Sequence, residues 1–293
     1  GDWGATLGRD FHGRVRYRRA FHAPATLDRH ERLWLVVEGV DARGVAAVNG
    51  IRLGEIEGYA IERCFDITQL IARNNQVTLE VDLPPAAVEQ PPRPGRENLP
   101  GGLVREVRLE VRSQWFIENL AIWNTAADGS FVAQGRIAGE ASPTRLAVVI
   151  SGCQRELAYF EAAPGEGFEM EFTAEDFPAW SRACPRRAAL EVKLLGHSLA
   201  VWQRHFETAV RTPSAHEAAR LVREILTEKD YQAFDDAGVA IVQEVPPAWA
   251  GRVCPRLAHH PSIVAWTAPG APAGSLCGRP WLSPETSFLL QPD

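Results

Sequence analysis

The sequence predicts a mainly β protein, in which two successive β-sandwiches are followed by a short, incomplete α/β unit. Apolar and polar residues alternate in short segments until about Val201, which is the period of strands with one buried face. Turn signals separate these segments at short intervals, as they do in sandwiches. From Pro213 onward a helix–strand pattern replaces the alternation. We therefore expect three domains, at residues 1–113, 114–212 and 213–293.

Length, composition and charge narrow the class of protein. The 293 residues are enough for two or three domains. A hydrophobic content of 45% and a charged content of 23% are typical of a soluble globular protein. No apolar run approaches the roughly 18 residues that a membrane span needs, so we expect no membrane partner. The net charge of -6 argues against a nucleic-acid partner, because phosphate binding favours a basic surface.

Neither the basic cluster nor the cysteines indicate a site. In RVRYRR the arginines alternate along a strand, which predicts a solvated outer face and leaves an anion site as the alternative; they are Arg14, Arg16 and Arg18. The cysteines are far apart and form no Cys-x-x-Cys pair, so we expect reduced thiols, with one or two disulfides left open, at Cys64, Cys153, Cys184, Cys254 and Cys277. The chain begins at Gly1 rather than Met, which leaves a removed signal peptide and a longer precursor both open, so no compartment is assigned.

The first sandwich is indicated by strands, one strong turn and one short helix. RLWLVVEG alternates with the period of a strand, and Asn49-Gly50 is the preferred filling of a type I′ hairpin turn. Asp66 or Thr68 is expected to cap one short turn of helix before a strand at Gln76–Val81. The proline-rich stretch Leu83–Gly102 then predicts a long loop, either functional or disordered.

The second sandwich is indicated by five strand candidates, FIENLAIWN, SFVAQGRIAG, TRLAVVIS, GFEMEFTA and AALEVKLLG. Their spacing is that of an immunoglobulin-like sandwich, and Trp123 and Trp202 are expected in its core. After it, Ser214 and Glu217 form a capping-box pattern for a helix that ends at Gly238, with a possible break near Thr227. VAIVQEVP and SIVAW are typical of buried parallel strands.

Several segments, spread over most of the chain, resemble motifs of one known protein family and occur in the same order as in that family. GRDFHGRVRYRRAF, GVDARGVAAVNGIRLGEIEGY, FDITQLI and GGLVREVRLEV resemble successive motifs of the galactose-binding-like jelly-roll, the sugar-binding domain of family 2 glycoside hydrolases. FTAEDFPAWSRACPRRAALEVKL is similar to the end of that family's immunoglobulin-like domain. DYQAFDDAGVAIVQEVP and HHPSIVAW resemble the third and fourth strands of its catalytic barrel. The family includes β-galactosidases, β-glucuronidases and β-mannosidases.

The resemblance implies two catalytic carboxylates, and the sequence departs from it at both. In the family, the strand after His-Pro-Ser-Ile continues through a Trp to a Gly-Asn-Glu, whose Glu is the general acid/base. Here Ala271 holds that position. The nucleophile belongs to a later barrel strand, and Pro213–Asp293 is far shorter than the about 250 residues of a closed barrel. We therefore expect a truncated TIM-barrel remnant that lacks the pair of carboxylates needed for glycoside hydrolysis.

The remaining candidates are polar and aromatic residues near the two barrel-like strands. Glu244, at the end of the strand Val239–Val245, is the obvious remaining carboxylate, and Glu285 is the alternative source of a second. Trp249 is expected either to stack on a sugar or to cover barrel core, and His260 either to line the site or to satisfy backbone groups in a turn. The candidate carbohydrate-binding residues are Gln243, Glu244, Trp249, His260 and Trp266. No catalytic residue, metal or cofactor is assigned.

Three functions remain open. The first is a non-catalytic carbohydrate-binding protein, and the second is an active β-glycosidase that uses other carboxylates or forms part of a larger enzyme. The third is an interaction scaffold that docks, as a homo-oligomer or onto another chain, through its incomplete barrel. The surfaces expected to be covered there are the helix Ala215–Ala237 and the tail Trp281–Leu290.

Overall fold

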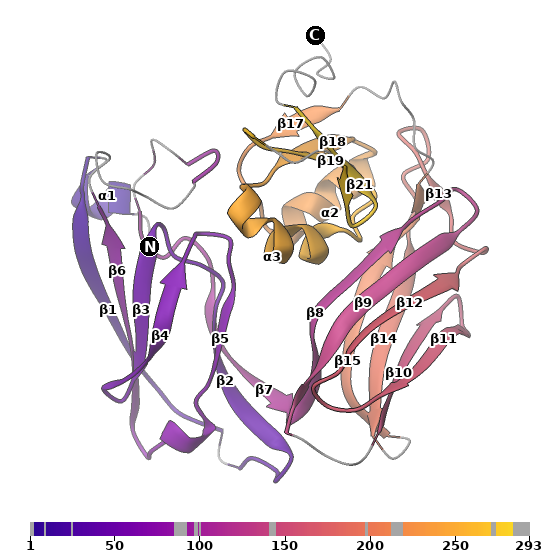
Figure 1. The fold of residues 1–293 in the computed structure, drawn as a ribbon. Coiled ribbons are helices and arrows are strands. Elements are labelled where there is room, and N and C mark those ends of the chain that lie inside the picture. Colours follow the sequence, from indigo (N-terminus) through magenta and orange to yellow (C-terminus); the bar gives the residue numbers. More distant parts are fainter. Residues whose placement is uncertain are drawn as a thin grey trace. The chain divides into compact units, whose positions relative to one another are not determined.

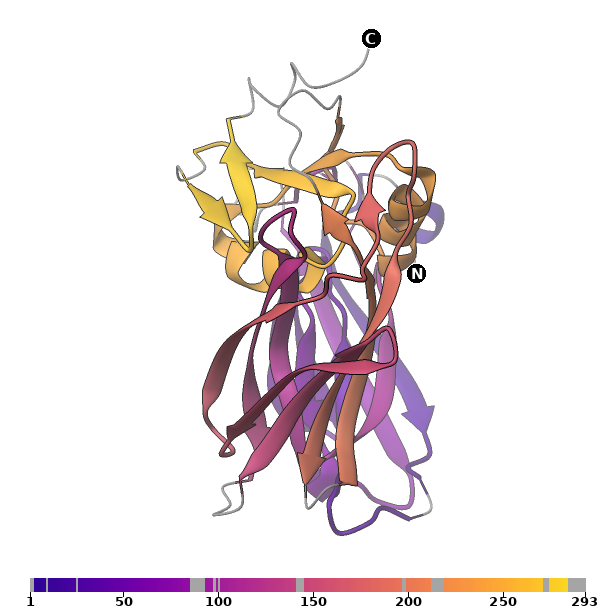
Figure 2. The same ribbon diagram turned by 90° about the vertical axis from the view of Figure 1, so that its right-hand side faces the viewer.

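The computed structural model describes residues 3–8, 10–24, 26–84, 93–96, 99, 101–140, 145–196, 199–211, 219–270 and 274–283. The chain divides into two compact units, Gly1–Ser113 and Gln114–Asp293, so the predicted boundary at residues 212 and 213 falls inside the second unit. Strands dominate both units, which confirms a mainly β protein (Figures 1 and 2). None of the helices in the described ranges is long and apolar enough to cross a membrane.

The first unit is a sandwich of two antiparallel sheets. Its elements are α1 (Trp3–Leu7), β1 (Gly13–Phe21), β2 (Glu31–Val37), β3 (Arg43–Val48), β4 (Ile51–Glu57), β5 (Arg63–Asp66), the 3-10 helix η1 (Thr68–Leu70), β6 (Asn75–Leu83) and β7 (Val107–Ser113). One sheet has the order β1-β6-β3-β4 and the other β5-β2-β7. Their inward side chains form one apolar core, which includes Leu35, Ile56 and Val81.

The β3–β4 turn and the exposed arginines of this unit agree with the sequence prediction. Asn49 and Gly50 join β3 to β4 with φ angles of 52° and 82°, the left-handed values that a type I′ turn requires at both positions. At the start of η1, the Oδ1 atom of Asp66 accepts a hydrogen bond from the backbone N–H of Thr68 at 2.9 Å. The arginine stripe of β1 is exposed as predicted, and Arg16 pairs with Glu80 on the neighbouring strand.

The described part of the proline-rich segment is attached to the sandwich through Asp41. This carboxylate is fully buried and accepts hydrogen bonds from Arg93 and from Arg96, the second at 3.0 Å. The backbone of Asp41 also exchanges two hydrogen bonds with Gly102 at the end of the segment. A single buried acid therefore contacts Arg93, Arg96 and Gly102 of this segment.

The second unit begins with another two-sheet sandwich. Its strands are β8 (Trp115–Asn124), β9 (Ser130–Gly139), β10 (Leu146–Gly152), β11 (Arg155–Ala162), β12 (Gly167–Thr173), β14 (Ala188–Gly196) and β15 (Leu199–Thr208). The sheets have the orders β11-β10-β14-β15 and β12-β9-β8. The five predicted strands are all present, while β11 and β15 were not among them. Trp202 packs against the core and Trp123 is half-buried on β8.

A smaller α/β segment follows in the same unit. The short strands β13 (Ala179–Trp180) and β16 (Val210–Arg211) lead to it, and its sheet has the order β17-β18-β19-β21-β20. These strands are β17 (Arg220–Val222), β18 (Ile241–Glu244), β19 (Ile263–Thr267), β20 (Ser275–Leu276) and β21 (Arg279–Leu282), all parallel except β20. The helices are α2 (Glu228–Ala237) and α3 (Pro247–Leu257). Figure 1 shows both helices along the sheet.

The two faces of this sheet are covered by different parts of the chain. Val242 of β18 packs in a small apolar cluster with Trp180 and Ala209 from the end of the sandwich. Its neighbour Gln243 points to the opposite face, where it meets Tyr231 of α2. Residues from the end of the sandwich therefore pack against Val242, and α2 packs against Gln243.

The predicted helix from Ser214 to Gly238 is correct only in its second half. Ser214 and Glu217 lie outside the described residues, but β17 occupies residues 220–222, where a helix was expected, and pairs in parallel with β18. The helix begins at Glu228, because Thr227 and Asp230 form a capping box there and satisfy the first free backbone N–H groups. Gly238 ends it with a φ of 65°, as predicted.

Candidate functional site

The carboxyl edge of the parallel sheet carries a charged pair. Glu244 is the last residue of β18, and Arg223 directly follows the neighbouring strand β17. The Nε atom of Arg223 donates to Oε2 of Glu244 at 3.0 Å, and the two side chains are 53% and 17% exposed. Ligands of open α/β sheets bind at the carboxyl ends of the strands, so this pair lies where a ligand is expected.

The side chain of Gln243 holds together the strand ends that carry this charged pair. Its side chain is fully buried, and its Nε2 atom donates to the backbone carbonyls of Val222 at 3.0 Å and Glu244 at 2.9 Å. The hydroxyl of Tyr231 donates to its Oε1 atom at 2.7 Å. The amide thus joins the ends of β17 and β18 to helix α2, which fixes the backbone that carries Arg223 and Glu244.

The other predicted site residues lie inside the protein. Trp266 is fully buried and donates its indole N–H to the carbonyl of Leu276 at 2.9 Å. Trp249, in α3, is only 5% exposed, which favours the alternative that it covers core rather than stacks on a sugar. His260 is fully buried in the turn before β19. Of the five candidates, the structure therefore leaves Glu244 accessible and uses Gln243 to hold it.

Two positions of the predicted chemistry fall outside the described residues. They are Ala271, expected at the position of the family's acid, and Glu285, the alternative second carboxylate. Thr267, the last residue of β19, is described, and its hydroxyl donates to the carbonyl of Leu282 at the end of β21 at 2.9 Å. The carboxyl ends of β19 and β21 are therefore tied together, next to the Arg223–Glu244 pair on β17 and β18.

A buried ionic cluster lies beside α2, towards the amino end of β19. The Oδ2 atom of Asp235 is 2.7 Å from Nδ1 of His260, and its Oδ1 atom accepts the backbone N–H of Ser262 at 3.0 Å. On the other side of the rings, Oε1 of Glu228 lies 3.1 Å from Nε2 of His259 and 3.1 Å from Nε2 of His260. The two imidazole rings therefore face one carboxylate oxygen.

Burial and neighbouring charges shift the pKa values of His259, His260 and Glu228 in different directions. Burial lowers the pKa of His259 to about 4, so this ring is neutral at neutral pH. Burial also acts to lower the pKa of His260, but the nearby carboxylates of Asp235 and Glu228 outweigh it and raise the pKa. Burial acts to raise the pKa of Glu228, yet the contacts with both histidines dominate and lower it, so Glu228 is ionised.

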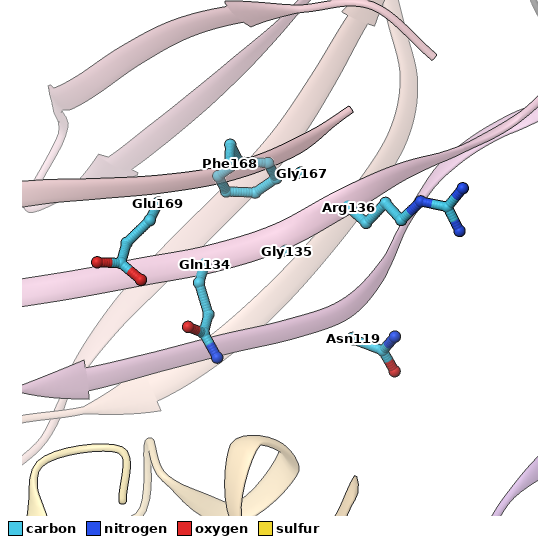
Figure 3. Close-up of a pocket in the computed structure, with 7 residues that line it drawn as sticks. All are labelled: Asn119, Gln134, Gly135, Arg136, Gly167, Phe168 and Glu169. Atoms are coloured by element: carbon cyan, nitrogen blue, oxygen red, sulfur yellow. The ribbon is translucent and has the colours of Figure 1, made fainter. Parts of the chain in front are cut away.

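A separate open depression of 470 Å³ lies on the sandwich of the second unit. Figure 3 shows Gln134 and Glu169 extending from adjacent strands on the same side, with Arg136 and Asn119 farther along. Arg136 is paired with Glu118 at 3.3 Å. The depression offers amide and charged groups at the surface of the sandwich.

Sequence reasoning did not select four residues that organise these sites. Arg223 was read as part of a helix, and Glu228, Asp235 and His259 carried no assignment. Glu228 lies 31 positions before His259, and Asp235 lies 25 before His260, so no short motif connects them. The available signal was the double histidine before Pro261, because a buried turn with two imidazoles needs acidic partners.

The family comparison identifies the first unit. Residues 12–115 match the model described as the glycosyl hydrolase 2 galactose-binding domain-like family. This agrees with the predicted jelly-roll resemblance over residues 1–113. No curated protein matches the chain in sequence.

Solved structures with the same fold cover nearly the whole chain. A Bacteroides uniformis β-glucuronidase matches with a TM-score of 0.67 and 17% identity over 91% of this chain and 42% of its own. A putative β-galactosidase from Bacteroides fragilis matches with 0.70 and 15% over 88% and 50%. A Bifidobacterium dentium β-glucuronidase, solved with coumarin-3-O-glucuronide, matches with 0.64 and 17% over 90% and 60%. The chain thus spans about half the length of these proteins.

Proposed function

We propose that this chain is a non-catalytic carbohydrate-binding protein of the family 2 glycosidase type. Residues 12–115 match the glycosyl hydrolase 2 galactose-binding domain-like family, and the chain shares its fold with solved β-glucuronidases and a putative β-galactosidase. In this proposal residues 114–212 are an immunoglobulin-like domain. Residues 213–293 correspond to part of a TIM barrel. The parallel order β17-β18-β19, with α2 and α3 between successive strands, supports that correspondence.

The observation that carries the binding proposal is the Arg223–Glu244 pair at the carboxyl edge. Glu244 offers acceptor oxygens and Arg223 offers donors, which are the groups that sugar hydroxyls need. Gln243 holds both strand ends through buried hydrogen bonds, so the pair stands on a rigid base. A preorganised polar edge of this kind binds a small polar ligand with less loss of entropy than a mobile one.

The expectation that the chain does not hydrolyse glycosides rests on the resemblance, which puts Ala271 at the acid position, where alanine cannot donate a proton to a leaving group. General acid catalysis typically contributes about 10²–10⁴-fold, and glycoside hydrolysis requires a second carboxylate as well. The competing possibility is an active β-glycosidase that uses other carboxylates, or that becomes active as part of a larger enzyme. Glu244 would then be one of the catalytic groups.

Binding is tested by titrating the protein with methyl β-galactoside, β-glucuronide and β-mannoside in saturation-transfer NMR and calorimetry. We expect at least one to bind with a dissociation constant on the order of 1 mM. Glu244→Gln and Arg223→Gln should each weaken that binding at least about 10-fold. Gln134→Ala, at the sandwich depression, is the matched control and should leave it unchanged. Equal binding by the parent and both edge variants contradicts the proposed site.

Turnover is tested with the corresponding chromogenic aryl β-glycosides. The parent and the Glu244→Gln variant should both show no turnover. Hydrolysis by the parent that disappears in Glu244→Gln would make Glu244 catalytic and favour the glycosidase alternative. Equal hydrolysis by both proteins would indicate a contaminating enzyme.

Docking through the α/β segment stays a prediction. Of the proposed covered surfaces, the residues of the tail after Ser283 lie outside the described chain, and only the second half of the helix Ala215–Ala237 is helical. Among the described residues from Ala219 to Ser283, no large apolar side chain is highly exposed. Sedimentation velocity measures the outcome, and a strict monomer would contradict the docking prediction.

A further inference from the structure

The histidine pair between α2 and β19 has the arrangement of a metal-binding site. The Nε2 atoms of His259 and His260 both lie 3.1 Å from the same oxygen of Glu228, and all three ligand atoms lie within 4.8 Å of one another. Two ligand atoms on a tetrahedral Zn²⁺ with bonds of about 2.0–2.1 Å are about 3.3 Å apart. The observed separations are therefore close to those of ligands that share one ion.

The orientation of His260 supplies a second, independent observation. Its Nδ1 atom lies 2.7 Å from the buried carboxylate of Asp235, which favours a proton on Nδ1. Its Nε2 atom is fully buried and makes no hydrogen bond with any residue in the described part of the chain, although Glu228 lies 3.1 Å away. In the tautomer with the proton on Nδ1, the Nε2 lone pair faces the Glu228 oxygen, and a cation placed between the two atoms would be bound by both.

The surroundings match those of a bound metal in two further respects. Asp235 stands behind His260 as the carboxylate stands behind a metal-ligating histidine, where it fixes the tautomer and the ring orientation. Glu228 is 45% exposed, so an ion can enter from solvent and keep a water molecule as its fourth ligand.

We propose that Glu228, His259 and His260 bind a late first-row divalent cation, Zn²⁺ in the first instance, with Asp235 as the group that orients His260. Imidazole and carboxylate ligands suit Zn²⁺ better than Mg²⁺ or Ca²⁺, which favour oxygen alone. The ion stabilises structure rather than serving the carboxyl edge: His260 precedes β19, whereas Glu244 ends the adjacent strand β18.

The ion would connect three elements of the second unit. Glu228 starts α2, and the histidines follow α3. His259 also contacts β15 of the sandwich: its ring meets Phe206 edge-on at 5.1 Å, and its carbonyl accepts the hydroxyl of Thr208 at 2.8 Å. Binding should therefore raise the unfolding temperature of the α/β segment together with the sandwich.

The test is a titration of the chelator-treated, dialysed full chain with Zn²⁺ and with Co²⁺. We expect one equivalent of tight binding, a higher unfolding temperature, and a Co²⁺ spectrum without the thiolate charge-transfer band that cysteine ligands would give. Glu228→Gln and His259→Gln should each weaken binding at least about 100-fold. The matched control is Glu31→Gln, which alters the exposed group Asp28, His30 and Glu31 and should leave binding unchanged.

Each other result overturns the proposal. No binding by the parent would do so, as would binding that survives in Glu228→Gln. Loss of binding in Glu31→Gln, or a thiolate band in the Co²⁺ spectrum, would place the ion elsewhere. If His259→Gln does not fold, Glu228→Gln decides alone, because this partly exposed side chain at a helix start tolerates an amide of the same shape.

Discussion

The Oδ2 atom of Asp235 lies 2.7 Å from Nδ1 of His260, and both side chains are fully buried. Asp235 also faces Arg187 at 3.4 Å, while its backbone carbonyl accepts the indole N–H of Trp180 at 2.9 Å. Arg187 and Trp180 belong to the sandwich side of the second unit. One aspartate therefore connects helix α2, the turn before β19 and the sandwich.

We predict that Asp235→Asn lowers the free energy of unfolding by about 3–5 kcal/mol, because it removes the buried charge that compensates Arg187 and holds His260. Urea unfolding followed by tryptophan fluorescence measures the loss. The matched control is Asp236→Asn, since Asp236 is 66% exposed and pairs with the same Arg187 at 2.7 Å. The control should cost at most about 1 kcal/mol, and equal losses in the two variants would contradict the role given to burial.

The corresponding prediction in the first unit concerns Asp41. Asp41→Ala leaves Arg93, whose side chain is 7% exposed, without its buried carboxylate, so we expect a loss of about 3–5 kcal/mol in the urea transition of that unit. Asp82→Ala is the control, because the Arg43–Asp82 pair is far more exposed, and it should cost at most about 1 kcal/mol. A small loss in Asp41→Ala would show that the arginines rearrange towards water.

The thiols should differ strongly in reactivity. Cys153 and Cys184 are exposed, whereas burial and then the charge of Glu62 raise the pKa of Cys64 to about 11. At pH 8 the thiolate fraction of Cys64 is then at least about 100-fold below that of an ordinary thiol, and it increases about 10-fold per pH unit until the pKa is reached. Iodoacetamide labelling with mass mapping should modify Cys153 and Cys184 first, and should reach Cys64 faster at pH 10.

The two remaining cysteines provide the internal reference for that experiment. Burial raises the pKa of Cys277 to about 11 and that of Cys254 still further, and both side chains are buried. We expect them to react only after unfolding in urea. Rapid labelling of Cys254 in the native protein would contradict the packing of α3 against the sandwich.

Sequence patterns predict the elements that depend on neighbouring residues and miss those that depend on distant ones. The Asn49-Gly50 hairpin is predictable because it depends on residues within a few positions of one another, and so is the local hydrogen bond from Thr68 to Asp66, although Ile67 takes the N-cap position of η1. Residues 220–222 were predicted as helix because Leu221 and Ile225 have a helical spacing, yet parallel pairing with β18 makes them a strand. That pairing joins residues about 20 positions apart, so the local pattern does not contain it.

The carboxyl edge of the parallel sheet could likewise be predicted from local patterns, whereas the ionic cluster at Glu228 could not. The strand ends at Glu244 and Thr267 follow from buried apolar runs, so the carboxyl edge was predictable. Burial of Trp266 follows from the same apolar run, but the choice between a buried and a ligand-binding role for Trp249 and His260 depends on packing between distant segments. The ion cluster at Glu228 needs the packing of α2 against the α3–β19 turn, which only the folded chain shows.

The last prediction concerns Gln243, on which the carboxyl edge depends. Gln243→Met keeps the length of the side chain but removes its hydrogen bonds to the carbonyls of Val222 and Glu244 and leaves the hydroxyl of Tyr231 without this acceptor. Buried polar groups that lose a partner cost about 1–3 kcal/mol each, so we expect a total loss of about 2–4 kcal/mol in urea unfolding. Tyr231→Phe is the control: it removes one of these bonds, leaves the bonds to the strand ends intact, and should cost about 1–2 kcal/mol.

Because the strand ends carry Arg223 and Glu244, sugar affinity should fall at least about 10-fold in folded Gln243→Met and stay within about 2-fold in Tyr231→Phe. Unchanged affinity in a folded Gln243→Met protein would show that the sugar binds away from this edge.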